Sequence, residues 1–166
     1  MLSVLLAAAP AFTQTRNRSS AKPKTTATAA AQKTSQARTA GATRVADQIK
    51  FLTRFIYLLG GVASGIAAVD EAAKRNEATP AILQKNQQSK TTVRTSIQGF
   101  RESLDKLEID FRAQPDLQPY YIKLAGVADG AATAEQQAAA NQFDAAGRSL
   151  LNVINRLTDV LVIMRQ

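Results

Sequence analysis

The sequence predicts an all-α protein, an antiparallel up-down four-helix bundle that follows a disordered N-terminal arm. Four runs of apolar residues recur at alternating steps of three and four, which is typical of helices packed around a common core. A chain of 166 residues with 45% hydrophobic residues is long and apolar enough for one such domain. Between Phe12 and Val45 there is no large apolar residue, so this part lacks the means to offset the entropy of ordering.

Residues 1–11 are expected to be a signal peptide. Leu2 to Phe12 is uncharged, and Ala9-Pro10-Ala11 fits the small-x-small pattern before a cleavage site. The stretch is too short to cross a bilayer. We therefore expect an extracytoplasmic protein, either periplasmic or secreted. Organellar import is the alternative, because a positively charged start is missing and the following residues are rich in Ala, Ser and Thr and free of acid.

Residues 12–42 are predicted to be a disordered, basic, Ala/Thr-rich linker. Of the formal net charge of +8, seven positive charges precede Asp47, the first acid, and the rest of the chain carries 14 basic and 13 acidic residues. The linker is either a solvated spacer or an arm attracted to an anionic surface. Because residues 43–166 are close to neutral, no specific nucleic-acid binding is expected. The candidate surface-binding residues are Arg16, Arg18, Lys22, Lys24, Lys33, Arg38 and Arg44.

The first two helices are predicted over residues 43–75 and 79–113. The second has Thr79 as its N-cap and Pro80 in its first turn, and it ends before Pro115. Each has one apolar seam. The seams are Val45, Ile49, Leu52, Ile56, Leu59, Ala63 and Ile66, and then Val93, Ile97, Phe100, Leu104, Leu107 and Phe111.

The last two helices are predicted over residues 116–140 and 142–165, with a turn at Asn141, a residue that tolerates the left-handed conformation. Gly126, Gly130 and Thr133 are expected to weaken or kink the third helix. If that helix ended at Gly130 instead, a short helix would be paired with one of more than twice its length. The seams are Leu117, Tyr121, Leu124 and Ala128, and then Phe143, Gly147, Leu150, Ile154, Leu157, Leu161 and Met164.

Because the first two helices are longer than the last two, their hairpin should project beyond the bundle. Asn86 and Lys90 occupy seam positions in the projecting part. They are expected to be exposed there, and a polar binding cleft is the alternative.

Phe55 to Val69 is an uncharged stretch that contains a Gly61-x-x-x-Gly65 pair. It is shorter than the ~20 residues that span a membrane, so the small residues are expected to allow close helix packing in the core. Two alternatives stay open. The stretch is a membrane contact, or the bundle interior near Gly60, Gly61 and Gly65 carries a small molecule.

The absence of Cys and His removes thiolate and imidazole chemistry, and with it the commonest metal ligands and general base. Neither a phosphate-binding glycine loop nor a serine-nucleophile motif is found. The acid pairs Asp70-Glu71 and Asp105 with Glu108 are interpreted as surface charge pairs. Tyr120 and Tyr121 are interpreted as half-buried packing residues. No catalytic, cofactor-binding or metal-binding residue is predicted, and no cofactor is expected.

These observations predict a non-enzymatic binding or structural module, held by its basic arm at an anionic surface or partner. The expected partner is a protein or an anionic component of the cell envelope, with peripheral membrane contact as a further possibility. Heptad seams this regular can also be completed between two chains, so both a monomer and a homodimer are compatible with the pattern.

Overall fold

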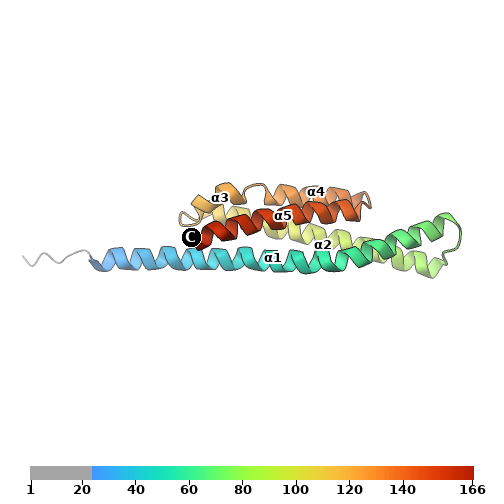
Figure 1. Ribbon diagram of the computed structural model, residues 1–166, viewed down its shortest axis with the longest axis horizontal. Coiled ribbons are helices and arrows are strands. Elements are labelled where there is room, and N and C mark those ends of the chain that lie inside the picture. The colour runs from blue at the N-terminus through green and yellow to red at the C-terminus, as the bar shows by residue number, and fades with distance from the viewer. Residues whose placement is uncertain (1–23) are drawn as a thin grey trace, which may run out of the picture.

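The computed structural model describes residues 24–166, and this part of the chain is entirely helical, without strands. Five helical segments follow one another (Figure 1): α1 (Lys24–Lys74), α2 (Pro80–Ala113), α3 (Gln118–Leu124), α4 (Val127–Ala139) and α5 (Phe143–Arg165). The all-α prediction is confirmed. Residues 1–23, which include the predicted signal peptide and the first part of the predicted linker, lie outside the described residues.

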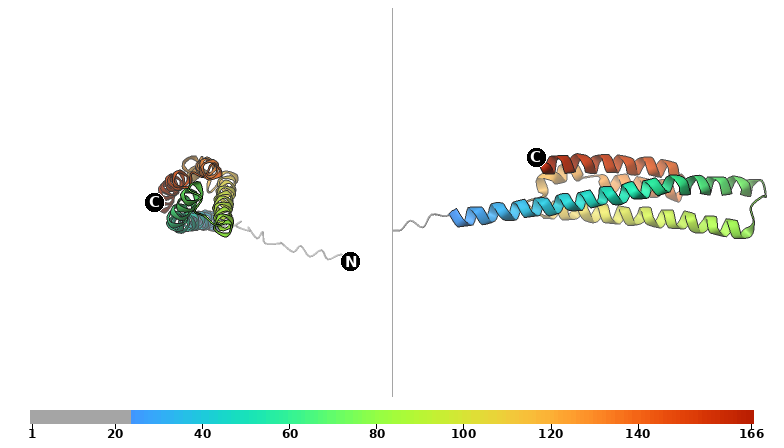
Figure 2. Two further views of the ribbon diagram at one scale, coloured as in Figure 1. Left: turned by 90° about the vertical axis from the view of Figure 1, so that its right-hand side faces the viewer. Right: turned by 60° about the horizontal axis from the view of Figure 1, so that its bottom comes forward.

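Each helix packs against its neighbours in a closed ring, seen end-on in Figure 2. α1 contacts α2 and α5, α2 contacts α3 and α4, and α5 contacts α3 and α4. The predicted seams face the centre of this ring. Leu52, Ile97, Leu104, Leu124 and Leu157 are all fully buried in one continuous core. The apolar spacing of the sequence therefore identified the buried face of α1, α2, α3 and α5, but not that of α4, whose buried residues are Val127, Ala131, Ala134 and Ala138.

α1 begins 19 residues earlier than predicted, at Lys24 rather than at residue 43. The prediction of disorder is therefore wrong for residues 24–42. Ala, Gln, Lys and Arg in this segment have high helix propensity, so a helix already formed by the core can extend through it. Tertiary contacts also hold the segment. The Thr34 hydroxyl donates to Asp116 over 2.8 Å, and Gly41 is buried at the position where Leu117 and Met164 approach α1.

The hairpin of α1 and α2 projects past the turn between α4 and α5, as the helix lengths predicted (Figure 1). α2 begins as expected, since the Thr79 hydroxyl accepts a hydrogen bond from the Ile82 N–H and Pro80 is the first helical residue. At its other end α1 also projects past the bundle, which the predicted start at residue 43 did not foresee.

The third predicted helix, residues 116–140, is broken into α3 and α4. Gly126, one of the three residues expected to weaken it, lies at the break with φ +89°, a left-handed conformation that favours glycine. The side chains of neighbouring helices bridge the break. Glu108 accepts from the Ala128 N–H over 2.8 Å, and Arg156 donates to the Gly126 carbonyl over 3.0 Å. Gly130 and Thr133 lie inside α4 and do not interrupt it.

The last turn is the predicted one. Asn141 has φ +61° between α4 and α5. Arg94 reaches across from α2 and donates to the Ala138 and Ala139 carbonyls at the end of α4 and to the Asn141 side chain. A cation at a helix C-terminus is favourable because the last carbonyls have no partners within the helix.

We expect Gly126→Ala to lower the free energy of unfolding by about 1–2 kcal/mol, because an L-residue is strained at this φ. Its Cβ would also lie 3.0 Å from the Arg156 guanidinium. Gly99→Ala is the matched control, since Gly99 lies within α2 with open space around its Cβ position, and alanine there should stabilise by up to about 1 kcal/mol. Urea denaturation measures both. Equal effects of the two substitutions would contradict the strain at Gly126.

Candidate functional site

The cationic residues predicted to bind an anionic surface are distributed along the N-terminal half of α1 and the chain before it. Arg16, Arg18 and Lys22 precede the described residues, and Lys24 begins the helix. Lys33 is exposed. It lies next to Thr34, which contacts Asp116 at the connection between α2 and α3. α1 thus carries positive charge past the bundle without any acid before Asp47.

Two members of the predicted set lie within the folded structure. Arg44 forms an ion pair with Asp110 of α2, so it holds α1 to its neighbour. Arg38 is half-buried and lines a shallow hollow beside α5, together with Lys50 and Arg165. The structure describes the side chains of Lys33, Arg38 and Arg44 from the predicted set. Of these three, Lys33 and Arg38 are available to an anionic surface.

The apolar stretch of α1 lies largely on the surface. Phe51, Tyr57, Leu58 and Val62 are all exposed, Tyr57 to 84%. Within the described residues, α1 is the one helix whose length and composition would allow it to cross a membrane. Only 22% of its most apolar 18-residue segment is buried. Core helices and export signals can meet the same criterion, so it does not by itself place the helix in a membrane.

The glycines of this stretch do not mediate helix packing, which corrects the prediction made for the Gly61-x-x-x-Gly65 pair. Gly60, Gly61 and Gly65 are exposed, and no atom lies within 4 Å of a Cβ built on any of them. Gly60 borders a surface hollow of about 240 Å³ between α1 and α5, beside Phe143 and Gly147. Close packing instead occurs at Gly41 and at Gly130, where a Cβ would meet Val153 of α5 at 2.7 Å.

Asn86 and Lys90 are buried, not exposed as predicted, although they lie in the projecting hairpin. Their exposed fractions are 6% and 7%. Both side chains donate to the same carboxylate oxygen of Asp70 on α1, Asn86 over 2.8 Å and Lys90 over 2.7 Å. Asp70 also borders a small hollow next to Asn141 and Asp144, so the cluster lies where the hairpin leaves the α4–α5 turn. The cluster therefore joins the two helices of the hairpin through polar contacts.

Two of the remaining candidate acids, Glu71 and Glu108, have hydrogen-bond partners. Glu71 accepts from Lys74 over 2.7 Å, and this hydrogen bond lowers the pKa of the Glu71 carboxyl. Glu108 holds the start of α4 and does not pair with Asp105. Among the described residues, no group of three or more acids could hold a metal ion. Tyr120 and Tyr121 are half-buried against the core, as predicted.

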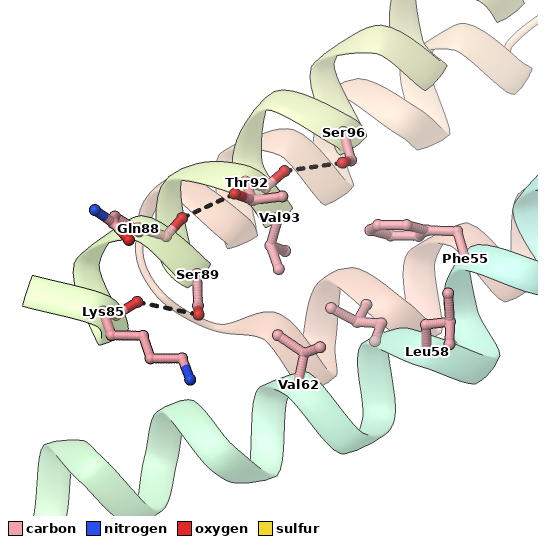
Figure 3. Close-up of a pocket in the computed structure, with 10 residues that line it drawn as sticks. Phe55, Leu58, Val62, Lys85, Gln88, Ser89, Thr92, Val93 and Ser96 are labelled. Atoms are coloured by element: carbon pink, nitrogen blue, oxygen red, sulfur yellow. Dashed lines mark hydrogen bonds between the residues drawn. The ribbon is translucent and has the colours of Figure 1, made fainter. Parts of the chain in front are cut away.

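A groove of about 470 Å³ lies between α1 and α2, where the two helices diverge (Figure 3). Phe55, Leu58, Leu59 and Val62 form its α1 side and Val93 lies opposite. The remaining α2 residues that line it are Lys85, Gln88, Ser89, Thr92 and Ser96.

Sequence reasoning missed this groove, although a signal for it is present. Phe51, Phe55, Leu58 and Val62 repeat the four-three-four spacing one position before the core seam. A helix with two adjacent seams has an apolar face wider than one partner helix covers. The second seam therefore remains partly exposed and forms one wall of the groove.

Comparison with known proteins gives no match, since no protein-family model fits the sequence and no curated protein or solved structure is significantly similar to it.

Proposed function

We propose that this chain is an exported, non-enzymatic binding module whose up-down helical bundle is held at an anionic surface by its cationic N-terminal segment. The distribution of charge carries the proposal. Seven of the positive charges precede the first acid, and the remainder of the chain is nearly neutral. α1 gives this segment a defined direction, because the helix begins at Lys24 and extends past the bundle at this end (Figure 1).

The bundle itself supplies the second contact of such a module. Its exposed apolar face on α1 and the projecting hairpin suit a protein partner or a component of the cell envelope. Holding the bundle near a surface raises its local concentration there, so that a weak second contact becomes effective.

Salt dependence tests the proposal. The full-length protein should bind vesicles that contain phosphatidylglycerol, bind pure phosphatidylcholine vesicles weakly, and lose its affinity steeply as salt rises. Screening is strong because these charges are exposed and the Debye length is only ~8 Å at physiological ionic strength. Co-sedimentation across a salt series measures the effect. Binding that does not change with salt would rule out the cationic segment as the tether.

A further inference from the structure

The groove between α1 and α2 has an apolar interior even where its lining residues are polar. Ser89, Thr92 and Ser96 on the α2 wall donate their hydroxyl hydrogens to carbonyls of their own helix, over 3.1, 2.9 and 2.8 Å (Figure 3). These donors are therefore already used within α2. An occupant of the groove meets the side chains of Phe55, Leu58 and Val62 on the other wall. The groove thus suits an apolar chain.

The two ends of the groove differ in charge. Lys85 is the one charged residue that lines it, and among the described residues Lys85 makes no ion pair. At the opposite end, Phe55 packs edge-on against Phe100 of α2 with ring centroids 5.0 Å apart and so joins the two helices. From Lys85 to Ser96, α2 rises by about 16 Å. The groove is therefore apolar along its length and cationic at one end.

We propose that this groove binds a single-chain amphipathic anion, a long-chain carboxylate. The hydrocarbon chain lies between Val62 and Val93 with its end toward Phe55, and the carboxylate accepts hydrogen bonds from the Lys85 ammonium. Charge complementarity selects this occupant, because an apolar groove with one unpaired cation favours an apolar chain that carries one anion.

Dodecanoate, at concentrations below those at which it forms micelles, is the probe. Calorimetric titration of the full-length protein should show saturable binding of one molecule per chain. Lys85→Gln should weaken it roughly tenfold, the effect of one charge-assisted hydrogen bond, and Lys85→Arg should retain it. Dodecanol should bind the wild-type protein as weakly as dodecanoate binds the Gln variant. Lys106→Gln, which removes an exposed cation elsewhere on α2, is the matched control and should change nothing.

A second variant tests the groove without altering any charge. Val62→Phe fills the space between the helices and keeps the surface apolar, so it should abolish dodecanoate binding while far-ultraviolet circular dichroism stays unchanged. Equal affinity of this variant and the wild type would place dodecanoate on the cationic N-terminal segment or the open α1 face and would overturn the proposal. So would a dimer in sedimentation velocity that Val62→Phe disrupts, because a second copy would then be the occupant.

Discussion

Replacing Lys22, Lys24, Lys33 and Arg38 together by Gln is expected to weaken binding to anionic vesicles by about three orders of magnitude. Each cation near an anionic membrane contributes about 1 kcal/mol, so four contribute about 4 kcal/mol, and every 1.4 kcal/mol is a factor of ten. Arg44 is left in place because its ion pair with Asp110 belongs to the fold. Vesicle co-sedimentation at fixed low salt measures the change.

A control variant separates the position of these charges from their number. Four exposed cations on other parts of the molecule are replaced by Gln, so that the net charge falls by the same amount. Its affinity should fall far less than that of the N-terminal variant. If both variants lose affinity equally, net charge alone drives binding and the N-terminal segment is not a distinct site. The four residues are Lys106, Arg112, Lys123 and Arg148.

Asp70→Leu is expected to lower the free energy of unfolding by about 3 kcal/mol, the largest effect on stability that we predict for a single polar residue here. The substitution removes the carboxylate that accepts from Lys90 and Asn86. The Lys90 side chain is only 9% exposed, so its ammonium would remain buried without a counter-charge. We place the effect at the low end of the range for buried pairs because the Asp70 side chain is 37% exposed. Urea denaturation followed by circular dichroism measures the loss.

Two further variants show whether that loss comes from the unpaired cation. Asp70→Leu combined with Lys90→Met removes both charges and should recover most of the stability, since apolar replacements of a buried ion pair are close to neutral. Glu71→Ala removes the neighbouring acid, whose partner Lys74 is exposed, and should have little effect. A double variant as unstable as Asp70→Leu alone would show that the carboxylate acts through something other than Lys90.

Helix positions could be predicted largely because they depend on local chemistry. The Thr79-Pro80 start of α2, the left-handed turn at Asn141 and the apolar seams each follow from residues close together in the sequence. The irregularity in the third helix was predicted correctly, but Gly126, Gly130 and Thr133 were equally good candidates for its position. Only the contacts of Glu108 and Arg156 show why the break is at Gly126.

The predicted start of α1 was wrong because order was judged only from the composition of the segment itself. Residues 24–42 lack large apolar side chains, but a long helix anchored at Val45 and Leu52 needs few contacts to continue through them. Gly41 supplies such a contact by the close approach of Leu117 and Met164. A glycine in a polar segment looks like a helix breaker until the side chains that lie against it are known.

By itself, the sequence determined the helical class, most helix ends, the core-facing residues outside α4 and one row of those in α5, and the separation of positive charge from a nearly neutral remainder, because spacing and composition are properties of the chain alone. The tertiary structure decided which polar residues are buried and which apolar residues are exposed. Asn86 and Lys90 are buried because Asp70 of another helix satisfies them, and Gly61 and Gly65 are exposed because no helix lies over their face. Burial depends on what lies opposite a residue, and that is settled only when the helices pack.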